Sequence, residues 1–265
     1  MPVRALSLLV ALALALLLGA CGGSKPQATV STRATTTDAT TTDAMPGETV
    51  FVRAYFIRGG KLAATGRKVV HTLAVGQASI GALLSGPNRA ERGFGFSTAL
   101  PENAELRKIT KIGEHLTVEL STSLDSAARA QVVTTLTQFS SIRDVVIVTP
   151  AGRSRSLGRA DFEALMPAVL VESPLPLEHV KSPLRVSGSS NTFEATSQLE
   201  LLNVNGKPLA TKTVTASSGS GIRGTFSVIL RFQAPAGPAT LVSYENSAKD
   251  GSRIDGVWIP LLISG

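Results

Sequence analysis

Apolar and polar residues of the segment 48–167 follow strand and helix periods in turn. Val50 to Ile57 is rich in β-branched and aromatic residues and stops at Gly59-Gly60, which predicts a strand followed by a turn. A second short strand is expected to include Lys68 to His71. Ala74 to Leu84 then places its large apolar residues on one helical face, and Gly86-Pro87 predicts the end of that helix.

The second half of this segment repeats the alternation. Gly93 to Pro101 is expected to be a loop, and Glu105–Ile112 and His115–Leu120 are expected to be paired strands. Ser123 to Asp125 offers N-cap residues for a second helix. The apolar face of this helix recurs at helical spacing, at Ala128, Val132, Leu136 and Phe139. With a last strand at Asp144–Val148, the order β-α-β-β-α-β predicts an α+β fold, a sheet with helices on one face.

Residues 168–265 show short strand patterns and no helical period. The clearest strands are expected at Leu184–Val186, Thr192–Leu202, Thr225–Phe232, Ala239–Tyr244 and Val257–Ile263. Turn residues such as Asn205-Gly206 and Asp250-Gly251 separate them. About seven short strands in about 95 residues are typical of an all-β immunoglobulin-like sandwich. We expect Trp258 to fill its core, and the alternative is a role in stacking on a ligand.

Residues 1–20 have the pattern of an export signal. One charge precedes the apolar run Ala5–Leu18, which is shorter than the roughly 20 residues that a membrane-spanning helix takes. The run closes with Leu18-Gly19-Ala20-Cys21, which resembles the lipobox of bacterial lipoproteins. That resemblance implies cleavage before Cys21 and acylation of this residue, the only cysteine in the chain. The alternatives are an ordinary secretory signal with a chance cysteine, or a buried free cysteine.

Residues 21–47 predict a disordered tether. Eight of the fourteen residues from Thr29 to Thr42 are Thr, and such a segment cannot bury enough apolar surface to offset its ordering entropy. Two or more acyl chains hold a protein stably on a membrane. We therefore expect an exported protein, anchored by lipid at Cys21 to the extracytoplasmic face of the cell membrane, with domains at 48–167 and 168–265.

The net charge of +7 lies mainly in the first domain. Residues 48–167 carry 15 basic and 10 acidic side chains, whereas residues 168–265 are nearly balanced. The basic residues include Arg53, Arg58, Lys61, Arg67, Lys68, Arg153, Arg155 and Arg159. On an exported protein this excess favours anionic lipid or wall polymers, and the alternative is an ordinary solvated surface. No nucleic acid partner is expected, because aromatic residues for base stacking are sparse.

The chain lacks the residue sets that metal binding and hydrolysis need. His71, His115 and His179 have no acidic or cysteine neighbour at ligand spacing, so no metal is expected. Gly95-Phe96-Ser97 lacks the closing glycine of a nucleophile elbow. Catalytic and cofactor-binding residues are therefore not expected, and neither is a cofactor.

Candidate carboxylates for glycan cleavage are also poorly placed. Glu114, Glu119 and Asp125 lie on or near one element; Glu119 is expected to face solvent and Asp125 to cap the second helix. A sugar cleft would need aromatic walls, and the amphipathic aromatics are limited to Tyr55, Tyr244 and Trp258. A wall hydrolase is thus the last of the functional hypotheses.

Gly219 to Gly224 satisfies the dinucleotide-binding pattern Gly-x-Gly-x-x-Gly. That motif works because a helix N-terminus follows the glycines and meets a pyrophosphate. Here the next residues, Thr225 to Leu230, have a strand pattern. We expect a loop between strands and no bound nucleotide.

The first domain resembles the GerMN domain of bacterial sporulation and spore germination lipoproteins. The resemblance lies in Val52–Phe56, Leu83–Pro87, Ser97–Pro101, Val118–Ser121, Thr135–Phe139 and Val145–Gly152. The second domain resembles the Ig-like domain that often follows GerMN. Its matching stretches are Glu172–Pro174, Val180–Gly188, Phe193–Ala195, Phe226 and Ser247–Gly251. The family implies a non-enzymatic envelope role and supplies no catalytic residues.

Three functional hypotheses follow from these observations. The first is a lipid-anchored interaction module that packs against another envelope protein or against copies of itself, since sheet edges and helix faces are usual partner surfaces. The second is binding of peptidoglycan or another wall polymer through the basic excess of residues 48–167. The third is the wall hydrolase.

Overall fold

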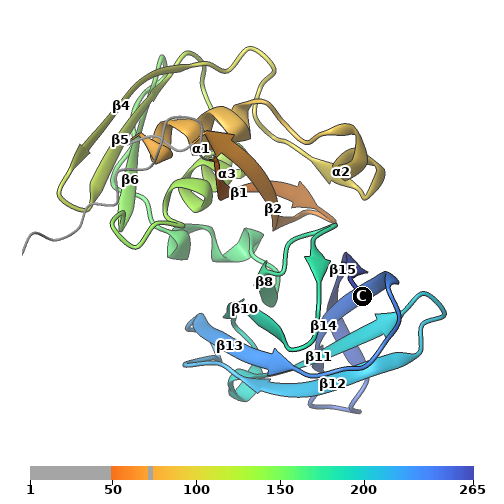
Figure 1. The fold of residues 1–265 in the computed structure, drawn as a ribbon. Helices are drawn as coiled ribbons and strands as arrows, with labels where there is room; N and C mark the ends of the chain where they lie inside the picture. The colour runs from red at the N-terminus through yellow and green to blue at the C-terminus, as the bar shows by residue number, and fades with distance from the viewer. Residues whose placement is uncertain (1–48, 71–73) are drawn as a thin grey trace, which may run out of the picture. The chain divides into compact units, whose positions relative to one another are not determined.

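The structure is a computed structural model that describes residues 49–70 and 74–265 (Figure 1). These residues lie in one compact unit, Ala44–Gly265. The expected signal peptide, the tether with Cys21, and His71 lie outside the described residues. Within the described ranges, no helix is both long and apolar enough to cross a membrane.

The N-terminal domain, the described part of residues 49–167, has the predicted α+β class. Its elements are β1 (Thr49–Arg58), β2 (Lys61–Val70), α1 (Val75–Leu84), α2 (Arg89–Gly93), β3 (Phe96–Ser97), β4 (Leu106–Ile112), β5 (His115–Leu120), α3 (Ser126–Leu136), β6 (Asp144–Thr149) and β7 (Gly152–Arg153). Most lie within a few residues of the expected ranges, because their periodicity is local. A 3-10 helix, η1 (Arg159–Leu165), follows them and leads into the second domain.

Two sheets flank the helices of this domain, where the sequence predicted one sheet. The orders are β2-β1-β3 and β4-β5-β6-β7, and the β5–β6 pair is parallel because α3 connects the two strands. Helices α1 and α3 contact each other and strands of both sheets (Figure 1). The core between the layers includes Tyr55, Phe56, Ile80, Leu83 and Leu136, all fully buried.

The β1–β2 hairpin is longer than the sequence indicated. β2 runs from Lys61 to Val70, whereas only Lys68 to His71 was expected, and it pairs with β1 over the full length of both strands. Gly59 and Gly60 have φ values of 57° and 77°, which a two-residue hairpin turn requires. The tight turn therefore fixes the register and extends the pairing through a polar stretch that has little strand pattern.

Helix α2 ends at Gly93, the first residue of the predicted loop Gly93–Pro101, and the short strand β3 lies within that loop. Asn88 begins α2 with a capping box: its Oδ1 accepts from the Glu91 amide at 2.9 Å, and Glu91 Oε2 accepts from the Asn88 amide at 2.7 Å. Helix α3 begins as predicted, because Asp125 Oδ1 accepts from the amide of Ala128 at 2.7 Å.

The C-terminal domain is an all-β sandwich of two sheets, as predicted. Its strands are β8 (Val169–Ser173), β9 (His179–Val180), β10 (Leu184–Ser190), β11 (Thr196–Asn203), β12 (Pro208–Thr215), β13 (Gly224–Leu230), β14 (Gly237–Asn246) and β15 (Arg253–Ile263), with a short 3-10 helix η2 (Phe193–Ala195) before β11. The sheet orders are β13-β10-β8 and β12-β11-β14-β15-β9. Their inner faces share one core, in which Leu199, Leu201 and Leu241 are fully buried.

Strands β8, β9 and β12 were not among those expected. β12 is an edge strand with mostly polar, exposed residues, so its sequence shows no alternation. β9 has only two residues. β8 directly follows η1 and is buried at Val169, Leu170 and Val171, and its continuous apolar run does not distinguish a strand from a buried linker.

Candidate functional site

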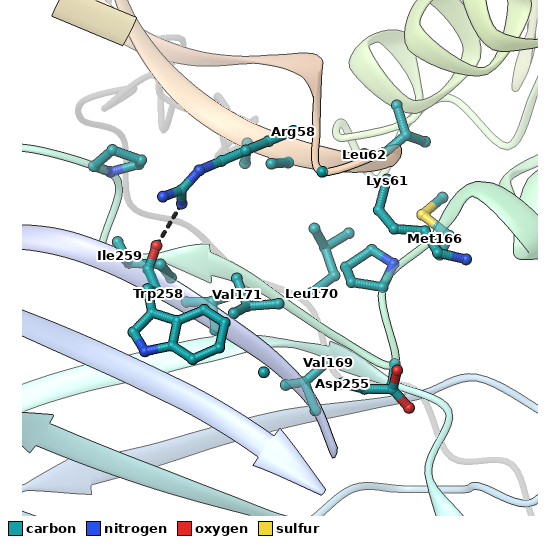
Figure 2. A pocket seen from close by; sticks show the side chains of 18 of the residues that line it. Arg58, Lys61, Leu62, Met166, Val169, Leu170, Val171, Asp255, Trp258 and Ile259 are labelled. Carbon is teal, nitrogen blue, oxygen red and sulfur yellow. Dashed lines mark hydrogen bonds between the residues drawn. The ribbon is translucent and has the colours of Figure 1, made fainter. Parts of the chain in front are cut away.

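The candidate site is a cavity of about 730 Å³ where the N-terminal and C-terminal domains meet (Figure 2). Five segments line it: the β1–β2 turn, the α2–β3 turn, η1 with the residues after it, β8, and the start of β15. The apolar part of the lining includes Leu62, Met166, Val169, Leu170 and Ile259. Its volume falls in the range of about 300–1,000 Å³ that is usual for small-molecule sites.

A buried hydrogen-bonded cluster fixes the junction beside this cavity. The Tyr55 hydroxyl of β1 donates to Glu172 Oε1 of β8. Arg159 at the start of η1 contacts both, with Nη1 2.7 Å from Glu172 Oε1 and Nη2 3.1 Å from the Tyr55 hydroxyl oxygen. Arg53 Nε adds a 2.8 Å bond to the Glu172 carbonyl. The cluster therefore ties the linker and β8 to the first strand of the chain.

The electrostatics of this cluster favour a neutral tyrosine and a charged glutamate. Burial raises the pKa of the Tyr55 hydroxyl well above its ordinary value, so the group stays protonated and donates to Glu172. Burial also acts to raise the pKa of Glu172, but the charge of Arg159 and the hydroxyl of Tyr55 outweigh it, and the net shift is downward. The pair Arg159–Glu172 is thus a partly buried ion pair, and the glutamate oxygen that it uses also accepts from Tyr55.

A second ion pair closes the junction on the cavity side. Arg223, which precedes β13, holds Glu163 of η1 with Nε 3.0 Å from Oε2 and Nη2 2.9 Å from Oε1. The same guanidinium donates to the Pro167 carbonyl at 2.7 Å, and Asn191 Nδ2 donates to Glu163 Oε1 at 3.0 Å. Glu163 has no oxygen without a partner here, so its role is to join the domains.

Arg58 links the β1–β2 turn to β15 across the cavity. Its Nη1 donates to the backbone oxygen of Trp258, as Figure 2 shows, and its Nε donates to the Phe94 carbonyl at 2.9 Å. The guanidinium also lies 5.3 Å from the ring centroid of Phe96. Burial lowers the pKa of Arg58 from its ordinary value. The cavity rim is therefore held by contacts from both domains.

Trp258 does not fill the sandwich core as predicted. Its side chain is 55% exposed and lines the cavity, whereas its neighbour Ile259 is buried in the core. Strand alternation accounts for this: Trp258 pairs with Val242 in the regular part of the β14–β15 register, and Ile259, Leu261 and Ile263 on the other face are the buried set. The outward position leaves the indole free for a contact that the sandwich itself does not use.

Most of the basic residues singled out in the sequence have internal partners. Arg67 forms an ion pair with Glu91, with Nη2 2.7 Å from Oε2, and Arg155 pairs with Asp161 at 2.6 Å. Lys61 Nζ donates to the Ala164 carbonyl at 2.8 Å. Arg53, Arg58 and Arg159 belong to the junction contacts described above. Of the eight, Lys68 and Arg153 remain as exposed cations whose side chains form no hydrogen bond or ion pair with another described residue.

The histidines and carboxylates do not gather at the junction. His115 Nδ1 lies 2.8 Å from Asp144 Oδ1 across the β5–β6 pair, a partner that sequence spacing did not reveal, and His179 lies on β9. Glu119 is exposed and Asp125 caps α3, both as predicted. Residues 49–70 and 74–265 contain no group of three or more His, Cys, Asp or Glu side chains that could hold a metal ion.

The glycine-rich stretch Gly219–Gly224 is a loop that leads into β13, as predicted. Its glycines allow close backbone approach: a Cβ at Gly219 would lie 2.5 Å from the Ala195 backbone, and one at Gly224 would lie 2.3 Å from that of Ser218. Arg223 within the stretch belongs to the junction. These contacts explain the glycines without a phosphate ligand.

Sequence reasoning missed the residues that build the cavity. Glu172 was noted as part of a motif but without a role, and Glu163, Arg223 and Asp255 were not singled out. Their partners are 13 to 119 positions away in the chain, so no local pattern marks them. An uninterrupted apolar run such as that of β8 was the one available sign that the two domains share a buried junction.

Comparisons with known proteins identify both domains. The family described as sporulation and spore germination matches residues 53–149, and the family described as immunoglobulin-like domain of bacterial spore germination matches residues 168–252. No curated protein matches the chain. Among solved structures, the tandem GerMN domains of the sporulation protein GerM from Bacillus subtilis are 17% identical, with 46% of this chain and 49% of that chain covered and a TM-score of 0.35. A putative lipoprotein from Clostridium perfringens is 20% identical, with 43% and 85% covered and a TM-score of 0.27.

The two family matches fall on the two domains without overlap. The first ends at Thr149, the last residue of β6, and the second begins at Ala168, one residue before β8. This chain spans about half the length of the GerM structure, and both TM-scores are below 0.5, so the assignment rests on the family matches. The chain therefore carries a domain that matches the sporulation and spore germination family, followed by a domain that matches the immunoglobulin-like domain of bacterial spore germination.

Proposed function

We propose that this protein is a non-enzymatic interaction module of the cell envelope, held at the extracytoplasmic face of the membrane by lipid on Cys21. The observation that carries the proposal is the pair of sporulation and germination family matches, one on each domain. The export signal pattern, the lipobox-like motif and the Thr-rich tether support the anchoring part of the proposal.

The junction supports a scaffold role. The clusters around Glu172 and Glu163 use side chains from both domains, so the two domains present their outer surfaces in a fixed relation. Partner-facing surface is available at β4, which lies at the edge of its sheet and leaves Ile112 74% exposed. An open strand edge can pair with a strand of a partner, and Lys108 and Lys111 on β4 would favour one with acidic residues.

The test is crosslinking mass spectrometry in living cells that produce the full-length chain. A second strain produces Cys21→Ala, which cannot be lipidated. Crosslinks from residues 48–167 to one envelope protein or to a second copy, lost in Cys21→Ala, are expected. Equal crosslinking with and without Cys21 would contradict the anchored module. Capture of wall fragments alone would favour polymer binding.

Wall-polymer binding through the basic residues has less support than the sequence indicated. Arg155 forms an ion pair with Asp161, and Arg159 forms one with Glu172. A charge paired internally attracts a polymer less, because its field is largely neutralised at the surface. A glycan contact, if present, would need a different site.

A further inference from the structure

Strand β15 carries a bulge that faces the cavity. The β14–β15 pairs Ser243–Val257 and Glu245–Ile254 enclose one residue on β14 and two on β15. The extra residue is accommodated at Asp255, whose φ of 53° is uncommon for a residue other than glycine. Bulges and such backbone conformations concentrate at functional sites, where they redirect side chains.

Gly256 makes room for the indole of Trp258 next to this bulge. A Cβ at Gly256 would lie 2.6 Å from Cη2 and 3.1 Å from Cζ3 of the Trp258 ring. The ring therefore lies directly over the glycine backbone while 55% of the side chain stays exposed. Arg58 holds the backbone oxygen of the same residue (Figure 2). The Trp258 indole thus rests on Gly256 on one side and is open on the other.

The polar groups of the cavity lining include both an acceptor and donors. Asp255 lines the cavity, is exposed, and has no hydrogen bond or ion pair with any other described residue. Lys61 Nζ uses one donor on the Ala164 carbonyl and has further protons. Glu163 and Arg223, by contrast, are saturated by each other and by neighbouring groups. The free groups are a carboxylate and an ammonium.

We propose that this cavity binds an N-acetylated sugar ring. The apolar face of a sugar stacks on an exposed indole such as that of Trp258. Its hydroxyls donate to the Asp255 carboxylate and accept from the Lys61 ammonium. An acetamido methyl group fits the apolar lining around Leu62 and Met166. This combination of an aromatic surface, apolar walls and a few polar groups is the usual make-up of a small-molecule site.

The charge balance of the lining disfavours an ionic ligand. A cation would approach Trp258 and Asp255 but would meet the positive charges of Arg58 and Lys61. An anion would meet the Asp255 carboxylate and would have only the Lys61 ammonium to hold it, since Arg58 and Arg223 are already engaged. A neutral ligand that both donates and accepts hydrogen bonds avoids both costs.

The proposal can be tested with the natural fluorescence of Trp258, the only tryptophan in the chain. The full-length protein is purified in a polyoxyethylene detergent, which carries neither sugar nor ammonium groups. It is titrated with N,N′-diacetylchitobiose, and separately with tetramethylammonium chloride and with sodium phosphate. A saturable fluorescence change with the disaccharide, and none with the two ions, is expected.

Two variants show whether Asp255 takes part. Asp255→Asn should raise the dissociation constant about tenfold or more, because the charged acceptor becomes a neutral amide and one of its two acceptor oxygens is replaced by a donor. Asp255→Gly should do the same and cannot be dismissed as misfolded, since glycine adopts the φ of this position without strain. Asp250→Asn is the matched control: it removes the same charge from the same hairpin, outside the cavity lining, and should change the constant less than about twofold.

Three results would overturn the proposal. The first is the absence of a saturable signal with the disaccharide. The second is saturation by tetramethylammonium or phosphate in place of the disaccharide, which would make this a cation or an anion site. The third is equal affinity in wild type, Asp255→Asn and Asp255→Gly. Loss of the crosslinks described above would not change the fluorescence titration. Failure of the interaction-module proposal can therefore be distinguished from failure of the sugar-binding proposal.

Discussion

Gln138 bonds to both backbone groups of Arg53, as a neighbouring β-strand residue would. Its Oε1 accepts from the Arg53 amide at 2.8 Å, and its Nε2 donates to the Arg53 carbonyl at 2.8 Å. One and two turns earlier, Thr135 accepts from the Tyr55 amide and Gln131 donates to the Tyr55 carbonyl. Side chains of α3 and the turn after it therefore complete the open edge of β1, where β3 is too short to reach.

Gln138→Met should destabilise the protein by about 2 to 4 kcal/mol. The substitution keeps the side-chain length but removes both bonds, which leaves the amide and carbonyl of Arg53 without partners in a partly buried position. The free energy of unfolding, measured by urea denaturation of wild type and variant, gives the difference. Gln233→Met is the control, since Gln233 is exposed and its side chain forms no hydrogen bond with another described residue. A loss below about 0.5 kcal/mol, equal to that of the control, would mean that water replaces Gln138 without cost.

Glu172→Gln should weaken the junction between the domains. Arg159 would keep its charge in a position where its side chain is only 25% exposed, and it would lose its ionic partner. A destabilisation of about 2 to 4 kcal/mol is expected, at the lower end of what a broken buried pair costs, because water reaches part of the pair. Since Glu172 connects the two domains, the variant should also unfold in two transitions where the wild type shows one.

Differential scanning calorimetry measures both effects of Glu172→Gln. Glu119→Gln makes the same chemical change at an exposed position of β5, where the side chain has no partner among the described residues, so it should keep a single transition. Limited proteolysis between residues 153 and 168 should become faster in Glu172→Gln only. A single transition at the wild-type temperature would show that the apolar contacts of β8 hold the junction without the ion pair.

Local sequence patterns predicted the strands and helices whose buried residues recur with the period of a strand or of a helix. β1, α1, β5 and α3 are examples, and Asp125 was found as an N-cap because capping uses neighbours three residues apart. The division of the strands into two sheets was not predictable, because it depends on which side of α1 and α3 each hairpin packs. β12 also escaped, since an exposed edge strand needs no apolar face.

The candidate site was much less visible in the sequence than the fold. The Tyr55–Glu172 and Glu163–Arg223 pairs join residues 117 and 60 positions apart. Trp258 was expected in the core because large aromatic residues usually fill cores, but it alternates with the core residues Ile259 and Leu261 and so faces outward. The two-residue period of this strand, with Ile259, Leu261 and Ile263 on one face, was the sign in the sequence that could have placed it there.

Asp144 should make stability depend on pH in the acid range. The Ser156 hydroxyl, then the His115 ring and Arg143, hold the pKa of this carboxyl at about 2, below its usual value. A depressed pKa stabilises the folded state above the unfolded pKa of about 4, and this stabilisation is lost as the pH falls through about 2. Asp144→Asn should therefore cost about 1 kcal/mol at pH 6, discounted for its position near the surface, and nothing at pH 2.

Urea denaturation of wild type and Asp144→Asn measures this dependence. The measurements are made at several pH values between about 2 and 7, which covers the range in which carboxyls titrate. Glu102 is exposed and its side chain has no partner among the described residues, so Glu102→Gln should show the same small difference from wild type at every pH. A constant difference between Asp144→Asn and wild type across the range would mean that the hydrogen bonds of Asp144 do not depend on its charge.

Gly188 and Gly256 should respond very differently to substitution by alanine. A Cβ at Gly188 would lie 2.0 Å from the Leu170 carbonyl oxygen, a backbone atom of the paired strand β8 that cannot move without breaking the ladder. At Gly256 the Cβ would meet the outer edge of the Trp258 ring, which can rotate toward solvent. Gly188→Ala should therefore cost about 3 kcal/mol or more, and Gly256→Ala less than about 1 kcal/mol.

Fluorescence distinguishes the two glycine variants further, because Trp258 is the only tryptophan. Gly256→Ala should shift the emission of the folded protein, since the indole is displaced from the glycine backbone, and Gly188→Ala should leave the folded emission unchanged. Urea denaturation followed at the same wavelength gives the stabilities. Equal costs for the two substitutions, or unchanged emission in Gly256→Ala, would mean that the indole does not rest on Gly256. The ring would then lack the fixed position that an aromatic platform at the cavity requires.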